Sequence, residues 1–371
     1  MLVLLIALGG SADPGQPQVL QITFDSPMLS KFFHQPVELG GEVLLPDSYY
    51  KEPNRRYPVI YVVPAFEGTD VVDESIESQW QRPMRSLGAE FIIVFLQAMM
   101  EIDGEDIHTE FADSATNGPW GAALTTEFIP QTDAHFRTIA SGDGRFLFGH
   151  SSGGWAVLWL QVNYPQTFNG AWALSPDPVD FHDFLGPDIT KPGQNFYRDA
   201  AGNLYGICRE HGHDRTTLEQ LIESPNGCGW RGENRSSTEK PWAQRQMDTY
   251  DDVFSPTLSS GKPAPLLNRS TGAIDPDVAA YWESRYDITH LLRERWSVLG
   301  PQLSGKLHVF VGTADTFHLE GSVGLMRDAM QHLGSDAEFG FAPGADHWQV
   351  YDYHDNLIRY AVSEMMRRLN P

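Results

Sequence analysis

The stretch that decides the fold runs from Arg145 to Leu160 and reads RFLFGHSSGGWAVLWL. An apolar run leads straight into Gly149-His150-Ser151-Ser152-Gly153-Gly154, and a second apolar run begins at Trp155. A serine in a G-x-S-x-G turn between a strand and a helix predicts a nucleophile with an exposed hydroxyl. The alternative is a glycine-rich turn that binds phosphate, but the G-x-G-x-x-G fingerprint and the P-loop lysine are both absent. We therefore predict that Ser151 is a nucleophile.

Apolar runs recur along the chain, with helix-like segments between them. Buried strands are expected at 57–66, 90–97, 145–149, 168–176, 306–315 and 336–342, after alternating, β-like segments within 17–50. Helices are expected at 77–87, 119–138, 152–163, 319–333 and 353–369. Strands that alternate with helices form mostly parallel sheets with helices on both faces, so the sequence predicts an α/β fold of this kind.

This alternation stops between about 177 and 300, where Gly, Pro, Asn, Asp and aromatic residues accumulate. We predict a catalytic domain formed by 13–176 and 301–371, with 177–300 as a large insertion after the fourth buried strand. Because the link leaves the carboxyl edge of the sheet, where ligands bind in open α/β folds, the insertion is expected to form a lid over Ser151. Its aromatic residues are expected to form a small core of their own and to line an apolar pocket. These residues are Phe181, Phe184, Phe196, Tyr197, Tyr205, Trp230, Trp242, Tyr250, Tyr281 and Trp282.

A serine hydroxyl needs a base to take its proton, and the base needs an acid to orient it. In folds with this kind of serine turn, the acid and then the histidine follow the serine along the chain. Asp315 ends the strand in HVFVGTAD, and His347 lies in the loop APGADHW after the next strand. We predict these two residues as partners of Ser151, although each alone could be an ordinary turn or loop residue. Glu320 is the second candidate acid, whereas Asp346 is too near His347 in the chain to reach its ring easily.

Acyl transfer also requires hydrogen-bond donors for the oxyanion that develops on the substrate. One donor is expected to be the backbone N–H of Ser152, directly after the nucleophile. The second is expected in VVPAFEG, the loop after the first buried strand, where Pro64 has no N–H. Ala65 and Phe66 are both candidates, and the amide of Phe66 is preferred.

The chain resembles the esterase D-like branch of the α/β-hydrolase superfamily. That branch includes S-formylglutathione hydrolases, feruloyl esterases, enterochelin-type esterases and mycolyltransferases. The resemblance is carried by YPVIYVVPAFEG, FADSATNGPWGAAL, FLFGHSSGGWAVLWLQVNYPQTFNGAWALSPDP, LHVFVGTADTFHL and PGADHWQVY, which span roughly 57–355. It implies an α/β-hydrolase fold, a triad of Ser151, Asp315 and His347, and an oxyanion hole at Phe66 and Ser152. Many relatives carry His-Gly where this chain has Pro64-Ala65.

The overall composition limits the classes of partner. The 371 residues carry a formal net charge of −23, which argues against nucleic acids and anionic membranes, because both require a basic surface. No stretch is apolar and long enough to span a bilayer. No CxxC-type metal motif is present, and no metal or organic cofactor is expected. The sequence leaves the oligomeric state open.

The first residues and the cysteines bear on the compartment. Residues 1–12, MLVLLIALGGSA, resemble the apolar core and small-residue cleavage site of a signal peptide. The two cysteines, Cys208 and Cys228, are close in sequence and form a plausible disulfide in an exported protein, although two free thiols are the alternative. These features predict a secreted or periplasmic protein.

Together these residues predict a serine hydrolase that cleaves carboxylic esters through an acyl-enzyme, with a preference for aromatic or medium acyl groups. The substrate would be a small-molecule or polymer-linked ester. Two alternatives remain open. The acyl group could pass to an alcohol instead of water, as in mycolyltransferases, or the chain could be a non-catalytic binding protein on a hydrolase fold. A peptidase is conceivable, but no residue favours it.

Overall fold

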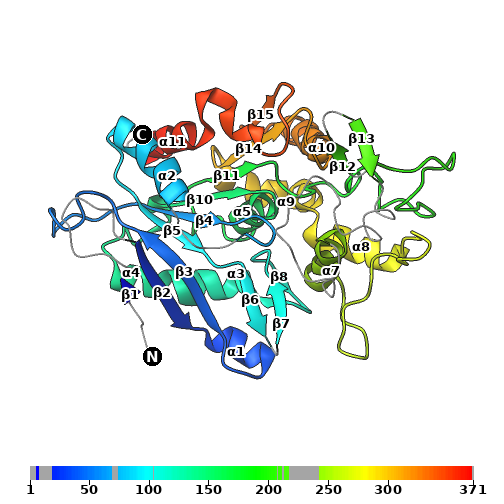
Figure 1. The fold of residues 1–371 in the computed structure, drawn as a ribbon, viewed down its shortest axis with the longest axis horizontal. Helices are drawn as coiled ribbons and strands as arrows, with labels where there is room; N and C mark the ends of the chain where they lie inside the picture. The colour runs from blue at the N-terminus through cyan, green and yellow to red at the C-terminus, as the bar shows by residue number, and fades with distance from the viewer. Residues whose placement is uncertain are drawn as a thin grey trace.

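The computed structural model describes residues 6–7, 19–68, 74–102, 104–206, 208–210, 213–216 and 242–369. Within them, a sheet of nine strands in the order β1-β2-β3-β5-β4-β10-β11-β14-β15 forms the centre of the molecule (Figure 1). Its strands are β1 (Ile6–Ala7), β2 (Val19–Asp25), β3 (Glu38–Leu44), β4 (Val59–Val63), β5 (Ile92–Leu96), β10 (Arg145–His150), β11 (Ala171–Leu174), β14 (Leu307–Gly312) and β15 (Glu338–Ala342). The six strands from β5 to β15 in this order are parallel to one another, whereas β1, β2 and β3 pair antiparallel.

The other elements connect and cover these strands. The helices are α1 (Pro27–Phe33), α2 (Glu74–Leu87), α3 (Trp120–Ala123), a π-helical turn (Leu124–Phe128), α4 (Ile129–His135), α5 (Ser152–Asn163), α7 (Trp242–Phe254), α8 (Pro276–Tyr286), α9 (Ile288–Leu303), α10 (Leu319–His332) and α11 (Leu357–Leu369), with short 3₁₀ turns at Gly142–Gly144 and Gln349–Asp355. Three small hairpins are formed by β6 (Met99–Ile102) with β7 (Glu105–His108), β8 (Asp113–Ser114) with β9 (Gly118–Pro119), and β12 (Cys208–Glu210) with β13 (His213–Thr216).

Side-chain alternation along the strands builds a core on each face of the sheet. Phe146 and Phe148 of β10 are buried on the face covered by α2 and α11, where Trp80 and Ile358 pack. Leu147, the residue between them, is buried on the opposite face together with α5. Since successive strand residues point to opposite faces, a run that is apolar throughout is the pattern of a strand covered on both sides. The predicted α/β fold with a mostly parallel sheet and helices on both faces is confirmed.

The segment 177–300 contributes helices to the described structure and no strand to the central sheet. It contains α7, α8 and most of α9. The expected boundary at 300 falls inside α9, which packs against α5 on the face of the sheet. α9 also contacts α10, so it lies with the layer that covers the sheet, and the domain division stays a prediction.

Most of the aromatic residues noted in this segment pack together. Five of them are at most 2% exposed and form ring contacts with one another or with Phe254: Phe181, Phe184, Phe196, Tyr250 and Trp282. Tyr197 is equally buried in the same core. Phe254 in turn contacts Trp155 of α5 with ring centroids 4.9 Å apart. The expected small core is present and is continuous with the core of the catalytic layer. Trp230 lies outside the described residues.

The residues from which export is predicted, 1–12 and the two cysteines, lie only partly within the described structure. Of residues 1–12, Ile6–Ala7 forms β1, which pairs antiparallel with β2. Cys208 is buried and disulfide-bonded, while Cys228 lies outside the described residues. Among the described residues, no helix combines the length and the apolar character needed to cross a membrane.

Candidate active site

Ser151 occupies the turn between β10 and α5 in a strained backbone conformation, with φ 58° and ψ −125°. The neighbouring glycines are required by close backbone contact. A Cβ atom on Gly149 would lie 2.1 Å from the carbonyl oxygen of Gly153, and one on Gly153 would lie 2.1 Å from the carbonyl oxygen of Val63. The turn therefore fixes Ser151 at the carboxyl end of β10, and strain of this kind is typical of functional sites.

His347 and Asp315 lie together at the carboxyl edge of the same sheet. The ring Nδ1–H of His347 donates to Asp315 Oδ2 over 2.9 Å, and both side chains are almost completely buried. Asp315 Oδ1 accepts from the backbone N–H of Phe317 over 2.9 Å. Burial alone would raise the pKa of Asp315, but the ring of His347 and these hydrogen bonds lower it overall. Asp315 is thus an ionised carboxylate that holds His347 with its Nε2 atom available to act as a base.

The other candidate acids have different contacts. Asp346 accepts hydrogen bonds from the backbone N–H groups of Trp348 and Gln349, so it caps the turn that follows His347. Glu320 forms an ion pair with Arg209 over 2.9 Å. Of these acids, Asp315 is the one whose carboxylate meets the ring of His347.

Two further groups hold the loop that carries His347, and sequence reasoning missed both. His150 Nε2–H donates to the backbone carbonyl of His347 over 2.9 Å. Burial, and then the proximity of His347, lower the pKa of His150 to about 3, so its ring is neutral. On the other side, Phe317 packs edge-on against the His347 ring, with ring centroids 4.8 Å apart, and the half-exposed Trp348 lies next to it. His150 sits directly before Ser151 in the sequence, which was the one available signal.

Ser151 Oγ donates to Asp177 Oδ1 over 3.3 Å in this structure, and no hydrogen bond links it to His347 within the described residues. Asp177 follows β11 and is 5% exposed. Its Oδ2 atom accepts from Ser152 Oγ over 2.7 Å and from Tyr250 Oη over 2.8 Å. Burial raises the pKa of Asp177, while these hydrogen bonds oppose that effect. Sequence reasoning did not single out this second carboxylate beside the nucleophile, because a Ser-Pro-Asp turn after a strand has no distinctive motif.

Glu110 lies beside Asp177 and is also buried. Neither of its carboxyl oxygens has a hydrogen bond of regular geometry among the described residues, although the Ser152 hydroxyl is near enough to favour its ionised form, and the side chain is 1% exposed. His108 Nε2 is 3.6 Å from Glu110 Oε1, but burial lowers the pKa of His108 to about 3, so it supplies no positive charge. Burial, and then the charge of Asp177, hold the pKa of Glu110 well above its usual range.

The two residues expected to supply oxyanion donors lie at the start of α5 and in the loop after β4. Ser152 is the first residue of α5, and an N–H group at this position has no acceptor within its own helix. Phe66 lies in the loop after β4, the strand whose last residue, Val63, contacts Gly153. Glu67, next to Phe66, forms an ion pair with Arg245 of α7, with Nε and Oε1 2.5 Å apart. The loop of Phe66 is therefore attached both to the serine turn and to the segment 177–300.

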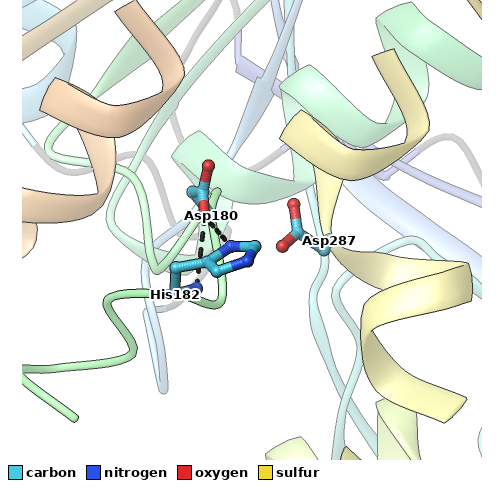
Figure 2. A group of neighbouring side chains, drawn as sticks. All are labelled: Asp180, His182 and Asp287. Carbon is cyan, nitrogen blue, oxygen red and sulfur yellow. Dashed lines mark hydrogen bonds and ion pairs between the residues drawn. The ribbon is translucent and has the colours of Figure 1, made fainter. Parts of the chain in front are cut away.

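A separate group of ionisable side chains lies where the loop after β11 meets the start of α9. Figure 2 shows Asp180, His182 and Asp287, whose potential ligand atoms lie within 4.8 Å of one another. Asp180 Oδ1 accepts from His182 Nδ1 over 2.7 Å, and its Oδ2 is 3.3 Å from the guanidinium of Arg293. Asp287 Oδ2 accepts from the backbone N–H of Phe181 over 2.8 Å. These contacts account for the group as a connection between the two segments.

The fold is that of an α/β-hydrolase, with the serine turn after β10, Asp315 after β14 and His347 after β15. The chain belongs to the Putative esterase family, which matches residues 36–271. Esterase Rv1288 of Mycobacterium tuberculosis is 29% identical over 192 residues, which cover 45% of this chain and 40% of that protein. The chain thus aligns with about two fifths of the length of this curated relative.

Solved structures share the fold at low sequence identity. A ferulic acid esterase aligns with a TM-score of 0.59 and 16% identity, covering 95% of this chain and 99% of its own. An S-formylglutathione hydrolase from Agrobacterium tumefaciens aligns with a TM-score of 0.54 and 15% identity, covering 98% of this chain and 99% of its own. The expected resemblance to α/β-hydrolase esterases is confirmed.

Proposed function

We propose that the protein is a serine hydrolase that cleaves carboxylic esters through an acyl-enzyme on Ser151. The observation that carries the proposal is the buried hydrogen bond between His347 and Asp315, at strand ends next to the strained turn of Ser151. His347 takes the proton of the Ser151 hydroxyl as Oγ attacks the ester carbonyl, and then gives it to the leaving alcohol. Asp315 orients His347 and stabilises its cation. The amides of Phe66 and Ser152 bind the oxyanion, and water releases the acid.

Attack requires the Ser151 hydroxyl to turn from Asp177 toward His347. Asp177 interacts with both of these residues, which supports their being neighbours. Ser151 is half-buried, and rotation of its hydroxyl about one side-chain bond is fast compared with catalysis. The resting hydrogen bond to Asp177 is therefore compatible with the proposed mechanism.

The test is hydrolysis of a panel of esters with acetyl, butyryl, octanoyl, feruloyl and polymer-linked acyl groups. Wild-type protein should cleave at least one ester class, and Ser151→Ala and His347→Ala should each lower kcat by about 10⁴-fold or more with the fold retained. Cleavage that survives in Ser151→Ala would contradict the proposal.

We further propose that aromatic or medium acyl esters are preferred. The support is apolar surface beside His347, where Phe317 packs on the ring and Trp348 is 43% exposed. Trp348→Ala should raise KM for feruloyl and butyryl esters more than for acetyl esters, because the lost contact is apolar. An equal change of KM for all acyl groups would contradict this preference.

The segment 177–300 is proposed to act as a lid through α7. Arg245 of α7 pairs with Glu67 in the Phe66 loop, and Tyr250 donates to Asp177 beside Ser151. Arg245→Met should lower kcat about tenfold, because the Phe66 amide loses its support, whereas the exposed pair variant Arg327→Met should not. Unchanged kinetics in Arg245→Met would show that α7 does not support the site.

The alternatives have direct tests. If the acyl group passes to alcohols, added alcohol should divert product from the free acid to a new ester, as the acyl-enzyme partitions between the two acceptors. If the chain is a non-catalytic binding protein, a fluorophosphonate should leave Ser151 unmodified. Export is proposed as well, supported by the disulfide at buried Cys208, since such bonds persist in oxidising compartments.

A further inference from the structure

We propose that Asp177 and Glu110 form an anionic subsite beside Ser151 that selects esters carrying an ammonium group over neutral and anionic esters. This inference rests on the proposed function, because it specifies the substrate class of the same site. The residues that define the subsite come from three parts of the chain: the loop after β11, the loop after β7, and α7.

Asp177 is held as an acceptor at the nucleophile. Four side-chain groups donate to it: Ser151 Oγ over 3.3 Å, Ser152 Oγ over 2.7 Å, Tyr250 Oη over 2.8 Å and Gln246 Nε2 over 3.3 Å. A carboxylate that receives donors on both oxygens is stabilised in its ionised form. Any substrate whose carbonyl reaches Ser151 Oγ is therefore brought next to this carboxylate.

Glu110 adds acceptor capacity, because its neighbour Ser152 donates to Asp177 in this structure. Its two oxygens are buried and have no hydrogen bond of regular geometry among the described residues. A buried polar group without a partner is costly, so it is a place where an incoming donor gains binding energy. Burial raises the pKa of both carboxyls, and the charge of Asp177 raises that of Glu110 further, so an incoming cation would favour the ionised form of the pair.

Within the described residues, the side chains that donate to Asp177 and the ring nearest Glu110 are uncharged groups. His108 from β7 is neutral, and Tyr250 and Gln246 from α7 donate as uncharged groups. His347 interacts with Asp177 but is already paired with Asp315. Arg245, on the same helix as Gln246, is engaged by Glu67.

An ammonium group can provide this site with a positive charge and, where it carries N–H groups, with hydrogen-bond donors for Glu110. A neutral hydroxyl would satisfy the oxygens but leave the charge, and an anionic group would be repelled. At short range and low exposure, one opposite charge changes selectivity by about tenfold or more.

The experiment compares cationic esters with neutral esters of the same shape, together with one smaller neutral ester that carries a hydroxyl. On the alcohol side, these are choline butyrate, 3,3-dimethylbutyl butyrate and 2-hydroxyethyl butyrate. On the acyl side, they are the ethyl esters of 4-(trimethylammonio)butyric acid and 5,5-dimethylhexanoic acid. Wild-type protein should prefer the cationic ester over its neutral isostere by about tenfold in kcat/KM on at least one side. The side that shows the preference identifies the part of the substrate beside Asp177.

The variants are close isosteres of the proposed subsite residues. Asp177→Asn and Glu110→Gln should each reduce the charge preference toward one, whatever they do to the absolute rate. Asp328→Asn removes one negative charge from an exposed position on α10 and should leave the preference unchanged. Near-UV circular dichroism confirms that each variant is folded.

A binding measurement separates this inference from the proposed function. Titration calorimetry with choline, and with 3,3-dimethylbutanol as its neutral isostere, does not require turnover. Choline binding that is lost in Asp177→Asn supports the subsite even if no ester is cleaved. Equal kcat/KM for both members of each ester pair together with no choline binding, or a preference that persists in both variants, would overturn it.

Discussion

Ser151 shows how much the site depends on single residues held in unusual positions. Its positive φ is a conformation that costs a non-glycine residue about 1–3 kcal/mol, and the surrounding turn must supply that energy. The residues that could react with it come from separate loops, Asp315 after β14 and His347 after β15. Asp177 shares the same edge of the sheet after β11.

Single substitutions test whether Asp315 or Glu320 is the acid that supports His347. Asp315→Asn should lower kcat by about 10²–10⁴-fold, because the amide no longer stabilises the cation of His347 and favours the wrong ring tautomer. Glu320→Gln should keep kcat within a few-fold, since Glu320 pairs with Arg209 instead. Steady-state kinetics on one ester checks both variants, and the reverse pattern would assign the acid to Glu320.

Sequence order was enough to predict that Asp315 and His347 lie together, because the carboxyl ends of neighbouring parallel strands share one edge of a sheet. Their roles in the reaction stay predictions. Glu110, Asp177 and His150 were missed for a physical reason. Their significance arises from tertiary contacts across long sequence separations, which leave no local pattern around any one of them.

At the scale of elements, the start of α5 packs so closely against the ends of β10 and β4 that no side chain fits at Gly149 or Gly153. The glycines of the serine turn are thus required by packing as well as by the turn. Gly324, inside α10, is a natural comparison, because a Cβ there would have no atom within 4 Å.

Gly153→Ala should lower the free energy of unfolding by about 3 kcal/mol, since its Cβ would overlap the Val63 carbonyl and force β4 and α5 apart. Gly324→Ala should raise it by about 0.5–1 kcal/mol, because alanine restricts the unfolded chain and fits the helix. Urea unfolding measures both. Equal stability of the two variants would show that the turn is not tightly packed.

Element boundaries show where sequence patterns lose resolution. The helix expected at 119–138 is divided into α3, a π-helical turn and α4, because Pro130 has no N–H to continue the regular hydrogen bonding. The helix expected at 353–369 begins only at Leu357, after His354, Asp355 and Asn356 adopt positive φ values. Both interruptions depend on local backbone geometry that apolar periodicity does not report.

At the scale of the whole molecule, some of the acidic side chains that give the net charge of −23 are buried in the fold. Asp287 is fully buried near Asp180, and burial followed by that neighbouring charge raises the pKa of Asp287 to about 7. The folded protein therefore holds this proton at pH values where the unfolded chain has lost it. A group of this kind stabilises the fold below its unfolded pKa of about 4 and loses that contribution as pH rises toward 7.

The contribution of Asp287 to the free energy of unfolding should consequently fall between pH 5 and pH 7.5, whereas the buried, neutral His108 and His150 act in the opposite direction over the same range. Compared with wild type, Asp287→Asn should shift the slope of unfolding free energy against pH in the positive direction, by at most about 1.4 kcal/mol per pH unit, which is the limit for one proton. Urea unfolding at several pH values gives the slopes, with Asp328→Asn as the exposed control. The same slope in Asp287→Asn and wild type would show that Asp287 does not hold the proton.

The most direct measurement of the central claim is the mass of the protein during turnover of a slow ester, with peptide mapping of the modified residue. The proposed mechanism predicts a transient increase equal to one acyl group, located on Ser151. The increase should be absent in Ser151→Ala and should persist longer in Asp315→Asn, where deacylation is slowed. Hydrolysis with no acyl group on Ser151, or with the label on another residue, would contradict the mechanism.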